Sequence, residues 1–487
     1  MNDTRQVLSG LEPAAPLIFF EEISHIPRPS YHEEKISEYL EKFAVDRGLE
    51  HYRDALGNVI IIKEASAGRE TSEPVVMQGH MDMVCEKEAG CSKDMMTKGL
   101  DLEVKGDLIS ARGTTLGADD GVAVCIMLAL LDDEELSHPR LECVFTVSEE
   151  TGMEGAAGID LSPVKGRRLI NIDSEIEHEI TVGCAGGARI NLTLQVERMS
   201  PSGEVLAVSV GGLKGGHSGI EIDKGRANAA LVLADVLTEA AGADKDMRLV
   251  SFNGGGKDNA IPAMAKALIT CDNADEVRSA IGRAAGRLAK EYAAADPGLN
   301  VSVEEAETPE TRHPISRANT ENILGVMLTA PRGVIDMTPD IPDLVQTSLN
   351  MGISDLLDDT MSIHYSIRSS VAVEKEELAN RLKTIGERYG FVYDRAGDYP
   401  AWEKAKASPL CDRIRAVYHE LTGDNMDITV IHAGLECGIL ADKLPGLDAV
   451  SIGPDILDIH TPAERLSISS LHRIYDVVRY VITEESI

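Results

Sequence analysis

The sequence contains no C-x-x-C pair, and its eight cysteines occur singly, at positions 85, 91, 125, 143, 184, 271, 411 and 437. This spacing argues against a disulfide framework and is typical of reduced structural thiols in a cytoplasm. No uncharged apolar run reaches the roughly 18 residues that a membrane-spanning helix needs. The N-terminal stretch also lacks the basic start and apolar core of a secretion signal. We therefore expect a cytoplasmic protein without membrane spans.

Basic residues are scarce as well. Lys and Arg number 47 against 81 Asp and Glu, which leaves a net charge of -34. A chain this acidic repels nucleic-acid phosphates and anionic membrane surfaces, so we expect neither as a partner. Its 487 residues exceed the size at which a single core keeps growing, and two domains are the expected organisation.

The order of strand and helix patterns divides the chain into three parts. Residues 1–187 alternate strands with helices, which is typical of an α/β domain, and residues 398–487 return to the same character. Between them, residues 188–397 mix strands of period two with long helices and predict an inserted α+β domain. The sequence shows no strict internal repeat. We predict one domain built from both ends of the chain and a second domain inserted into it.

Local signals place helices near both ends of the chain. Ser30 and Glu33 have the spacing of a capping box, which predicts the start of a helix that continues to about Val45. The last helix is predicted to have one apolar face, which carries Leu471, Ile474, Val478 and Val481.

The stretch Leu141–Ala156 joins an apolar strand to two adjacent carboxylates and a turn that contains glycine, in the sequence LECVFTVSEETGMEGA. Neighbouring side chains on an extended segment point to opposite sides. Glu149 and Glu150 are therefore predicted to face different ways, so that one binds an ion while the other faces the reacting group.

Further acidic and histidine residues follow other predicted strands or begin a helix. His80 and Asp82 follow one strand, where alternation puts their side chains on the same side, and Asp173 ends another strand. Asp119 and Asp120 lie at a helix N-terminus, where simple helix capping is the alternative interpretation, favoured for Asp120. In open α/β sheets, ligands bind at the edge where strands end.

Together with His460, these positions form an oxygen-rich set with two imidazoles and no thiolate: His80, Asp82, Asp119, Glu149, Glu150, Asp173 and His460. Such a set suits two divalent ions that share one carboxylate, with Asp119 as the candidate bridge. Ligand softness permits zinc, manganese or cobalt and does not choose among them.

Six ordered motifs carry a resemblance to a known family. They are MQGHMDMV, GADDG, SEETGMEGA, NIDSE, HAGLECG and DIHTPAE, and the likeness extends over the whole chain, insert included. The sequence resembles the M20 family of di-zinc peptidases and, within it, the aminoacyl-histidine (Xaa-His) dipeptidase group. The resemblance implies a two-domain fold in which an α/β catalytic domain carries an inserted α+β domain for lid closure or dimerisation.

The resemblance also implies five metal ligands: His80 and Asp173 on one ion, Glu150 and His460 on the other, and Asp119 bridging both. It places Asp82 behind His80, where its carboxylate orients and tunes the imidazole. Glu149 would be the general base that takes a proton from the metal-bridging water and delivers it to the leaving amine. Two zinc ions are the implied cofactor, with manganese or cobalt as alternatives.

Four residues are implied to bind the substrate: His217, Asn259, Arg368 and Gly434. His217 would stabilise the tetrahedral intermediate, and the other three would hold the C-terminal carboxylate. The fork of Arg368 suits this task because it can bond both carboxylate oxygens, while an ordinary salt bridge is the competing interpretation. His432 and Glu436 flank Gly434 and are further candidates for lining the same pocket.

The expected activity is the metal-dependent hydrolysis of dipeptides, with Xaa-His dipeptides as the implied substrates. The alternatives are a broader M20 dipeptidase or tripeptidase, an amidohydrolase acting on N-acyl amino acids, and a non-enzymatic metal-binding or interaction protein. The last is disfavoured, because a structural metal site closes its coordination sphere and needs no Glu149 beside it. A small peptide is the expected partner. A homodimer formed through the insert, and an insert that replaces such a partner internally, both stay open.

Overall fold

The computed structural model describes residues 7–200, 203–307, 313–339, 341 and 343–483. The chain divides into two compact units. The first comprises Met1–Cys184, Trp402–Val430 and Leu435–Ile487, and the second comprises Ala185–Ala401 and Ile431–Gly434. The lid or dimerisation role of residues 188–397 stays a prediction. The predicted inserted domain did not include the short segment Ile431–Gly434, which groups with the second unit.

The first unit is built on a mixed eight-stranded sheet with the order β1-β2-β6-β3-β7-β21-β8-β20. Its strands are β1 (Glu50–Arg53), β2 (Val59–Lys63), β3 (Val75–His80), β6 (Leu141–Thr146), β7 (Arg168–Asn171), β8 (Glu179–Cys184), β20 (Asp427–Ile431) and β21 (Asp448–Ser451). The neighbours β6, β3, β7 and β21 run parallel. The carboxyl ends of β6, β3 and β7 therefore share one edge of the sheet. A four-stranded sheet joins β4 (Leu102–Lys105), β5 (Leu108–Ala111), β22 (Ile456–Leu457) and β23 (Arg465–Ser467).

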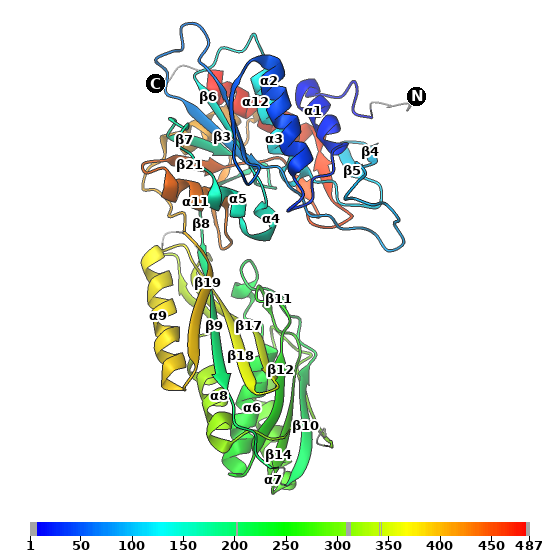
Figure 1. The fold of residues 1–487 in the computed structure, drawn as a ribbon, viewed down its shortest axis with the longest axis vertical. Helices are drawn as coiled ribbons and strands as arrows, with labels where there is room; N and C mark the ends of the chain where they lie inside the picture. The colour runs from blue at the N-terminus through cyan, green and yellow to red at the C-terminus, as the bar shows by residue number, and fades with distance from the viewer. Residues whose placement is uncertain (1–6, 201–202, 308–312, 340, 342, 484–487) are drawn as a thin grey trace. The chain divides into compact units, whose positions relative to one another are not determined.

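Several helices of the first unit contact its larger sheet (Figure 1). The helices of this unit are α1 (Ala14–Ser24), α2 (Glu34–Arg47), α3 (Ala118–Asp132), α4 (Glu149–Gly152), α5 (Glu154–Gly158), α10 (Pro409–Thr422), α11 (Glu436–Lys443) and α12 (Ile468–Thr483). Helix α3 contacts β3 and β6, and both α1 and α12 contact α3. The apolar face predicted for the last helix is confirmed, because its four predicted residues are all buried in α12.

The predicted capping box at Ser30 and Glu33 is wrong. Helix α2 begins at Glu34, and no side chain caps its first turn. The Ser30 hydroxyl instead donates to Asp82 Oδ2 at 2.8 Å, and Glu33 Oε1 accepts two hydrogen bonds from Ser148. Both uses need only a hydroxyl donor and a carboxylate acceptor, so local spacing alone does not distinguish them.

Glu177 ties the segment after β7 to two C-terminal helices. Its carboxylate accepts hydrogen bonds from Arg473 Nε at 2.5 Å and Nη2 at 2.6 Å, and from the Tyr418 hydroxyl at 3.0 Å. Burial alone would raise the pKa of Glu177, but the hydrogen bonds from Arg473 hold that pKa below its usual value.

Replacing Glu177 by glutamine is expected to lower the free energy of unfolding by about 1–2 kcal/mol at neutral pH, because a charged hydrogen bond to a partly exposed arginine is lost. A carboxylate with a lowered pKa stabilises the fold above its unfolded-state pKa, and this contribution is lost as the pH falls through the folded-state pKa. The difference between the two proteins should therefore shrink in acid. Urea unfolding at about pH 7 and about pH 3 measures it, and an equal difference at both values would contradict the assignment.

The second unit contains a nine-stranded antiparallel sheet with the order β15-β10-β14-β12-β17-β18-β9-β19, to which β16 is added beside β17. Its strands are β9 (Gly186–Gln195), β10 (Glu204–Gly211), β12 (Arg248–Gly254), β14 (Ala265–Cys271), β15 (Asn300–Glu305), β16 (Gly333–Met337), β17 (Val345–Leu357), β18 (Thr360–Ser369) and β19 (Val392–Tyr399). Its helices are α6 (Ala229–Ala243), α7 (Ala274–Glu291), α8 (Arg317–Thr329) and α9 (Ala372–Arg388), with a short 3-10 turn at Ile222–Lys224. A separate ribbon pairs β11 (Gly216–His217) with β13 (Ala260–Ile261).

The strand order of this sheet reveals two halves with the same topology. In one half the chain order β10-α6-β12-β14-α7-β15 gives the sheet order β15-β10-β14-β12. In the other, β9-α8-β17-β18-α9-β19 gives β19-β9-β18-β17. The halves join where β12 pairs antiparallel with β17. The sequence shows no strict repeat because strand order depends on connections and on apolar patterning rather than on residue identity.

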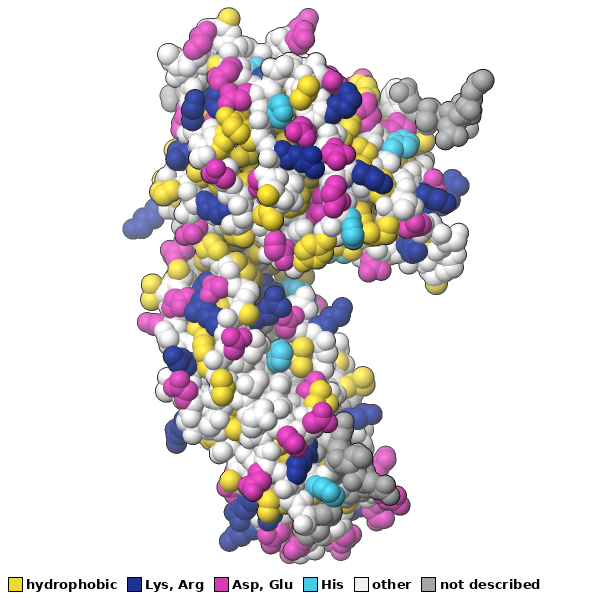
Figure 2. All heavy atoms as spheres, viewed as in Figure 1, with side chains coloured by type: hydrophobic (Ala, Val, Ile, Leu, Met, Phe, Trp, Pro, Cys, Tyr) yellow, Lys and Arg dark blue, Asp and Glu magenta, His cyan; other side chains and the backbone are white. Residues whose placement is uncertain are grey.

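Three general features of the molecule are its surface charge, its cysteines and the character of its helices. Acidic and basic side chains are interspersed over the visible face of each unit (Figure 2). All eight cysteines are free, and six of them are buried. Within the described ranges, no helix combines the length and the apolar character needed to cross a membrane.

Candidate metal centre

The acidic and histidine residues predicted at strand ends lie at one edge of the first-unit sheet. His80 is the last residue of β3, Asp173 follows the end of β7, and Glu149 follows the end of β6. These strands are neighbours in the order β6-β3-β7 and run parallel. Their carboxyl ends therefore bring residues that are distant in sequence to one place.

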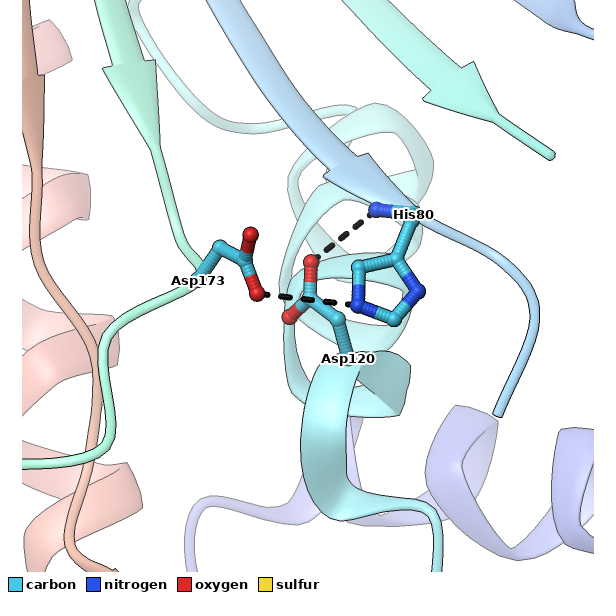
Figure 3. Close-up of side chains that lie close together, drawn as sticks. All are labelled: His80, Asp120 and Asp173. Atoms are coloured by element: carbon cyan, nitrogen blue, oxygen red, sulfur yellow. Dashed lines mark hydrogen bonds and ion pairs between the residues drawn. The ribbon is translucent and has the colours of Figure 1, made fainter. Parts of the chain in front are cut away.

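His80 stands at the centre of a first group of side chains (Figure 3). Its Nε2 lies 3.6 Å from Asp173 Oδ1 and 3.1 Å from Asp119 Oδ1. Asp120 lies close by, but its Oδ2 accepts the backbone N–H of His80 at 3.0 Å and its Oδ1 accepts that of Ala123 at 3.3 Å. Asp120 therefore caps the regular part of α3, as predicted, while Asp119 faces the imidazole.

The two carboxylate oxygens of Asp119 meet different histidines. Oδ1 lies 3.1 Å from His80 Nε2, and Oδ2 lies 3.1 Å from His460 Nε2. His460 Nε2 in turn lies 3.0 Å from Glu150 Oε2. Potential ligand atoms of His80, Asp119 and Glu150 all lie within 4.8 Å of one another. Two groups of side chains thus share one carboxylate.

Asp82 lies behind this arrangement and is fully buried. Its Oδ1 is 3.2 Å from His80 Nδ1 and accepts the backbone N–H of Glu149 at 3.1 Å. The predicted placement of the His80 and Asp82 side chains on one side is confirmed. A carboxylate on the far nitrogen of an imidazole sets the orientation and basicity of the ring.

The two histidines show how strongly these carboxylates attract positive charge. Burial alone would lower the pKa of His80, but hydrogen bonds to Asp119 and Asp82 raise that pKa well above its usual value. Hydrogen bonds to Asp119 and Glu150 raise the pKa of His460 to about 10. The negative potential of the cluster therefore favours a bound cation.

A buried carboxylate oxygen without a hydrogen-bond partner also indicates that this cluster can bind a divalent ion. Glu150 Oε1 is buried and has no hydrogen-bond partner in the described part of the chain. An unpaired buried carboxylate oxygen is costly unless a cation satisfies it. Imidazole and carboxylate ligands together suit zinc, manganese or cobalt. The residues present can therefore hold metal.

The extended conformation predicted for Glu149 and Glu150 is wrong. The two residues do not continue an extended segment, because Ser148 adopts a left-handed conformation and Glu149–Gly152 forms the single helical turn α4. The two carboxyls still differ in their surroundings. Glu150 contacts a histidine, whereas burial, together with the charges of Glu436 and Glu150, raises the pKa of Glu149 to about 8.

The four residues predicted to bind substrate all lie in the second unit. The Nδ1 atom of His217 accepts the backbone N–H groups of Gly219 at 3.1 Å and Ile220 at 3.2 Å. An accepting Nδ1 leaves Nε2 as the proton-bearing nitrogen. Burial, and then the charge of Arg368, lowers the pKa of His217, so the neutral ring is favoured.

Arg368 lies close to His217. A Cβ atom added to Gly219 would lie 3.0 Å from His217 Cε1, 3.2 Å from Arg368 Nε and 2.7 Å from the His432 carbonyl oxygen. Arg368 Nη1 donates to the Tyr399 hydroxyl at 3.0 Å. Among the described residues Arg368 forms no ion pair, so its charge is available for a ligand.

Asn259 and Gly434 are the other two residues predicted to bind substrate. The Asn259 carbonyl oxygen accepts the Ser218 N–H at 2.8 Å, beside His217, and the Asn259 side chain is exposed. Gly434 ends the segment that groups with the second unit. In that segment, His432 Nε2 lies 2.7 Å from Ser348 Oγ.

Glu464 holds the segment that leads to Asp119, a role that the sequence did not indicate. Its Oε2 accepts the N–H groups of Leu116 at 2.8 Å and Gly117 at 2.9 Å, and its Oε1 accepts that of Ala118 at 2.8 Å. The sequence feature that could have indicated this role is the position of Glu464 in the DIHTPAE motif, four residues after His460.

Glu436 joins the strands that carry the metal-binding candidates. Its Oε2 accepts hydrogen bonds from Gln78 Nε2 at 2.5 Å and from the Thr146 hydroxyl at 2.6 Å, and Asn171 Nδ2 donates to Gln78 Oε1 at 2.8 Å. Gln78, Thr146 and Asn171 lie on β3, β6 and β7. This buried network ties the three strand ends together.

An α/β sheet with acidic and histidine side chains gathered at its strand ends is typical of a metal-binding protein, and comparison with known proteins gives its family. The peptidase family M20/M25/M40 matches residues 76–484. The chain is 36% identical over 481 residues to the cytosol non-specific dipeptidase of Escherichia coli (strain K12), covering 98% of this chain and 99% of that relative. The chain belongs to peptidase family M20/M25/M40.

Solved structures agree with this assignment. The aminoacylhistidine dipeptidase of Vibrio alginolyticus is 33% identical and superimposes with a TM-score of 0.90, covering 100% of both chains. The aminopeptidase PepT of Bacillus cereus is 16% identical, with a TM-score of 0.55 over 96% of this chain and 97% of that one, and shares the fold. The predicted family, the α/β fold class and a hydrolase acting on peptide bonds are confirmed.

Proposed function

We propose that this metallopeptidase is a cytoplasmic dipeptidase that uses two divalent ions, with zinc as the first candidate, and that Xaa-His dipeptides are among its substrates. The names of the Escherichia coli and Vibrio alginolyticus relatives support the dipeptide class. The former name also supports the cytoplasm and a range wider than Xaa-His.

One observation carries the two-ion proposal, the placement of Asp119 with one oxygen 3.1 Å from His80 and the other 3.1 Å from His460. A carboxylate that faces two imidazoles in this way is suited to bridge two ions. Asp173 would complete the ligands of the ion at His80, and Glu150 those of the ion at His460. When bound, such ions polarise the scissile carbonyl and make an attacking water more acidic.

Glu149 would carry the proton in this reaction. Burial raises the pKa of Glu149 above that of a free glutamate, and a carboxyl group held beside the metal-binding candidates can accept a proton and later return it. The carboxylate would take the proton of the attacking water and deliver it to the amine that leaves. Asp82 would hold the His80 ring and, through the backbone N–H of Glu149, the start of α4.

The second unit would recognise the end of the substrate. Arg368, with no ion pair among the described residues, would bond both oxygens of a C-terminal carboxylate. His217, with its Nε2 proton, would donate to the oxygen that becomes negative in the transition state. Asn259 and Gly434 would complete the carboxylate site.

Substrate comparison tests the proposal. The purified protein loaded with zinc should hydrolyse Ala-His faster than the tripeptide Gly-Gly-Ala, and should leave an N-acetyl amino acid intact. Release of free amino acid is measured for each compound, and the reactions are repeated after chelation and after restoring zinc, manganese or cobalt. Preference for the acetylated compound would contradict the dipeptidase proposal, and equal turnover of many dipeptides would favour the broader one. A homodimer stays a prediction that the mass in solution tests.

A further inference from the structure

Residues 28–33 connect α1 to α2 and send three side chains beneath the metal centre. Arg28 has an exposed fraction of 1% and Glu33 one of 6%, which is unusual for charged residues outside regular structure. The residues that Arg28, Ser30 and Glu33 contact lie 52 to 115 positions further along the chain.

Arg28 fastens two of the metal-binding segments to each other. Its Nη1 donates to the carbonyl oxygens of Met81 at 3.0 Å and Asp82 at 2.8 Å, and its Nη2 donates to that of Gly117. The first two carbonyls follow His80, and the third precedes Asp119 by two residues. A single buried guanidinium therefore holds the backbone on both sides of the first group.

Ser30 acts on the carboxylate behind His80. Its hydroxyl donates to Asp82 Oδ2 at 2.8 Å. The Glu150 N–H approaches the same oxygen at 3.4 Å, and the Glu149 N–H approaches Oδ1 at 3.1 Å. The position of Asp82 is thus set from two sides, by residue 30 and by the start of α4.

Glu33 acts on the residue that precedes Glu149. Its Oε1 accepts the Ser148 N–H at 2.9 Å and the Ser148 hydroxyl at 2.9 Å. Ser148 has φ 54° and ψ 38°, a left-handed conformation that is uncommon for a residue other than glycine. Two hydrogen bonds to one buried carboxylate hold this turn, and the turn sets the direction in which Glu149 leaves β6.

We propose that residues 28–33 are a positioning segment of the catalytic centre, in which Glu33 holds Glu149 in its working place through Ser148. Glu33 does not touch the substrate in this proposal, and it acts only through the Ser148 turn. The inference rests on the proposed function, because it assumes that Glu149 carries the proton.

Two replacements of Glu33 separate this role from a merely structural one. Glu33→Ala removes the acceptor and should lower kcat for Ala-His by roughly 10- to 100-fold, the usual cost of losing a residue that orients a catalytic group. KM and bound zinc should change by less than about 2-fold, because the ligands keep their own supports. Glu33→Gln keeps an acceptor oxygen for both Ser148 donors and should restore kcat to within about 3-fold of the unchanged protein.

Two further variants serve as controls for the Glu33 replacements. Glu34→Ala alters the exposed neighbouring glutamate and should leave kcat, KM and zinc content unchanged. Ser148→Ala removes only the hydroxyl bond and should give a kcat between those of Glu33→Gln and Glu33→Ala. Should Glu33→Ala fail to fold, Ser148→Ala decides, since an unchanged kcat in that variant would overturn the proposal.

A double variant distinguishes this inference from the proposed function. In a Glu149→Gln background, Glu33→Ala should lower the residual kcat no further, because residues that act as one unit are not additive. A full additional loss would show that Glu33 acts elsewhere and would overturn the inference alone. Full activity of Glu149→Gln with zinc bound would instead overturn the proton-carrier role in the proposed function.

Discussion

Replacing Glu149 by glutamine is expected to lower kcat for dipeptide hydrolysis by about 100- to 10,000-fold, which is the contribution of a positioned general base. The amide is nearly isosteric with the carboxylate but cannot accept the proton of the attacking water. Glu149 is not among the candidate ligands, so the variant should keep its zinc. Initial rates on Ala-His, with zinc measured on the same sample by atomic emission, give both quantities.

A neighbouring glutamate provides the control for this experiment. Glu154 begins α5, is exposed, and accepts a hydrogen bond from the Tyr31 hydroxyl at 3.1 Å. Glu154→Gln should retain kcat within about 2-fold, because the side chain is exposed and the amide oxygen can still accept the Tyr31 hydrogen bond. Survival of activity in Glu149→Gln with metal still bound would show that another group carries the proton.

Replacing Asp119 by asparagine is expected to empty both metal positions, because its two oxygens face the two histidines. An amide offers one weaker oxygen and cannot neutralise two cations. Because loss of a residue behind a ligand already costs about 10- to 100-fold in affinity or activity, loss of a shared ligand should cost more than about 100-fold in kcat. Equilibrium dialysis against zinc, followed by assay, measures the two effects together.

Asp173→Asn is the matched comparison for the shared ligand. Asp173 lies 3.6 Å from His80 Nε2 and belongs to one group only, so its loss should weaken one ion and spare the other. Asp132→Asn changes an exposed aspartate at the other end of α3 and should alter neither. If Asp119→Asn and Asp173→Asn lost the same single ion, Asp119 would not be a bridge.

Local sequence determined those features that depend on neighbours along the chain. Alternation of side chains at the end of β3 predicted that His80 and Asp82 lie on one side, which the 3.2 Å separation bears out. The same local reasoning separated Asp120, which caps α3, from Asp119, which faces the imidazoles. Apolar spacing identified the buried face of α12. Each depends on backbone periodicity, which a single sequence expresses directly.

Local signals misled where a distant partner competed for the same group. Ser30 and Glu33 have the spacing of a capping pair, yet Asp82 and Ser148 take their hydrogen bonds. Glu149 was expected on an extended segment, yet the left-handed Ser148 turns the chain into α4. A side chain with several equally good partners is decided by which of them the fold brings within about 3 Å.

The sequence by itself determined the family and the order of its motifs, because these reside in residue type and spacing. Only the tertiary structure decided that Ile431–Gly434 groups with the second unit, that two halves of that unit share one topology, and that residues 28–33 support the metal centre. The physical reason is that such contacts join residues far apart in the chain. They form only once the sheets bring those segments together, and no periodicity along the sequence records them.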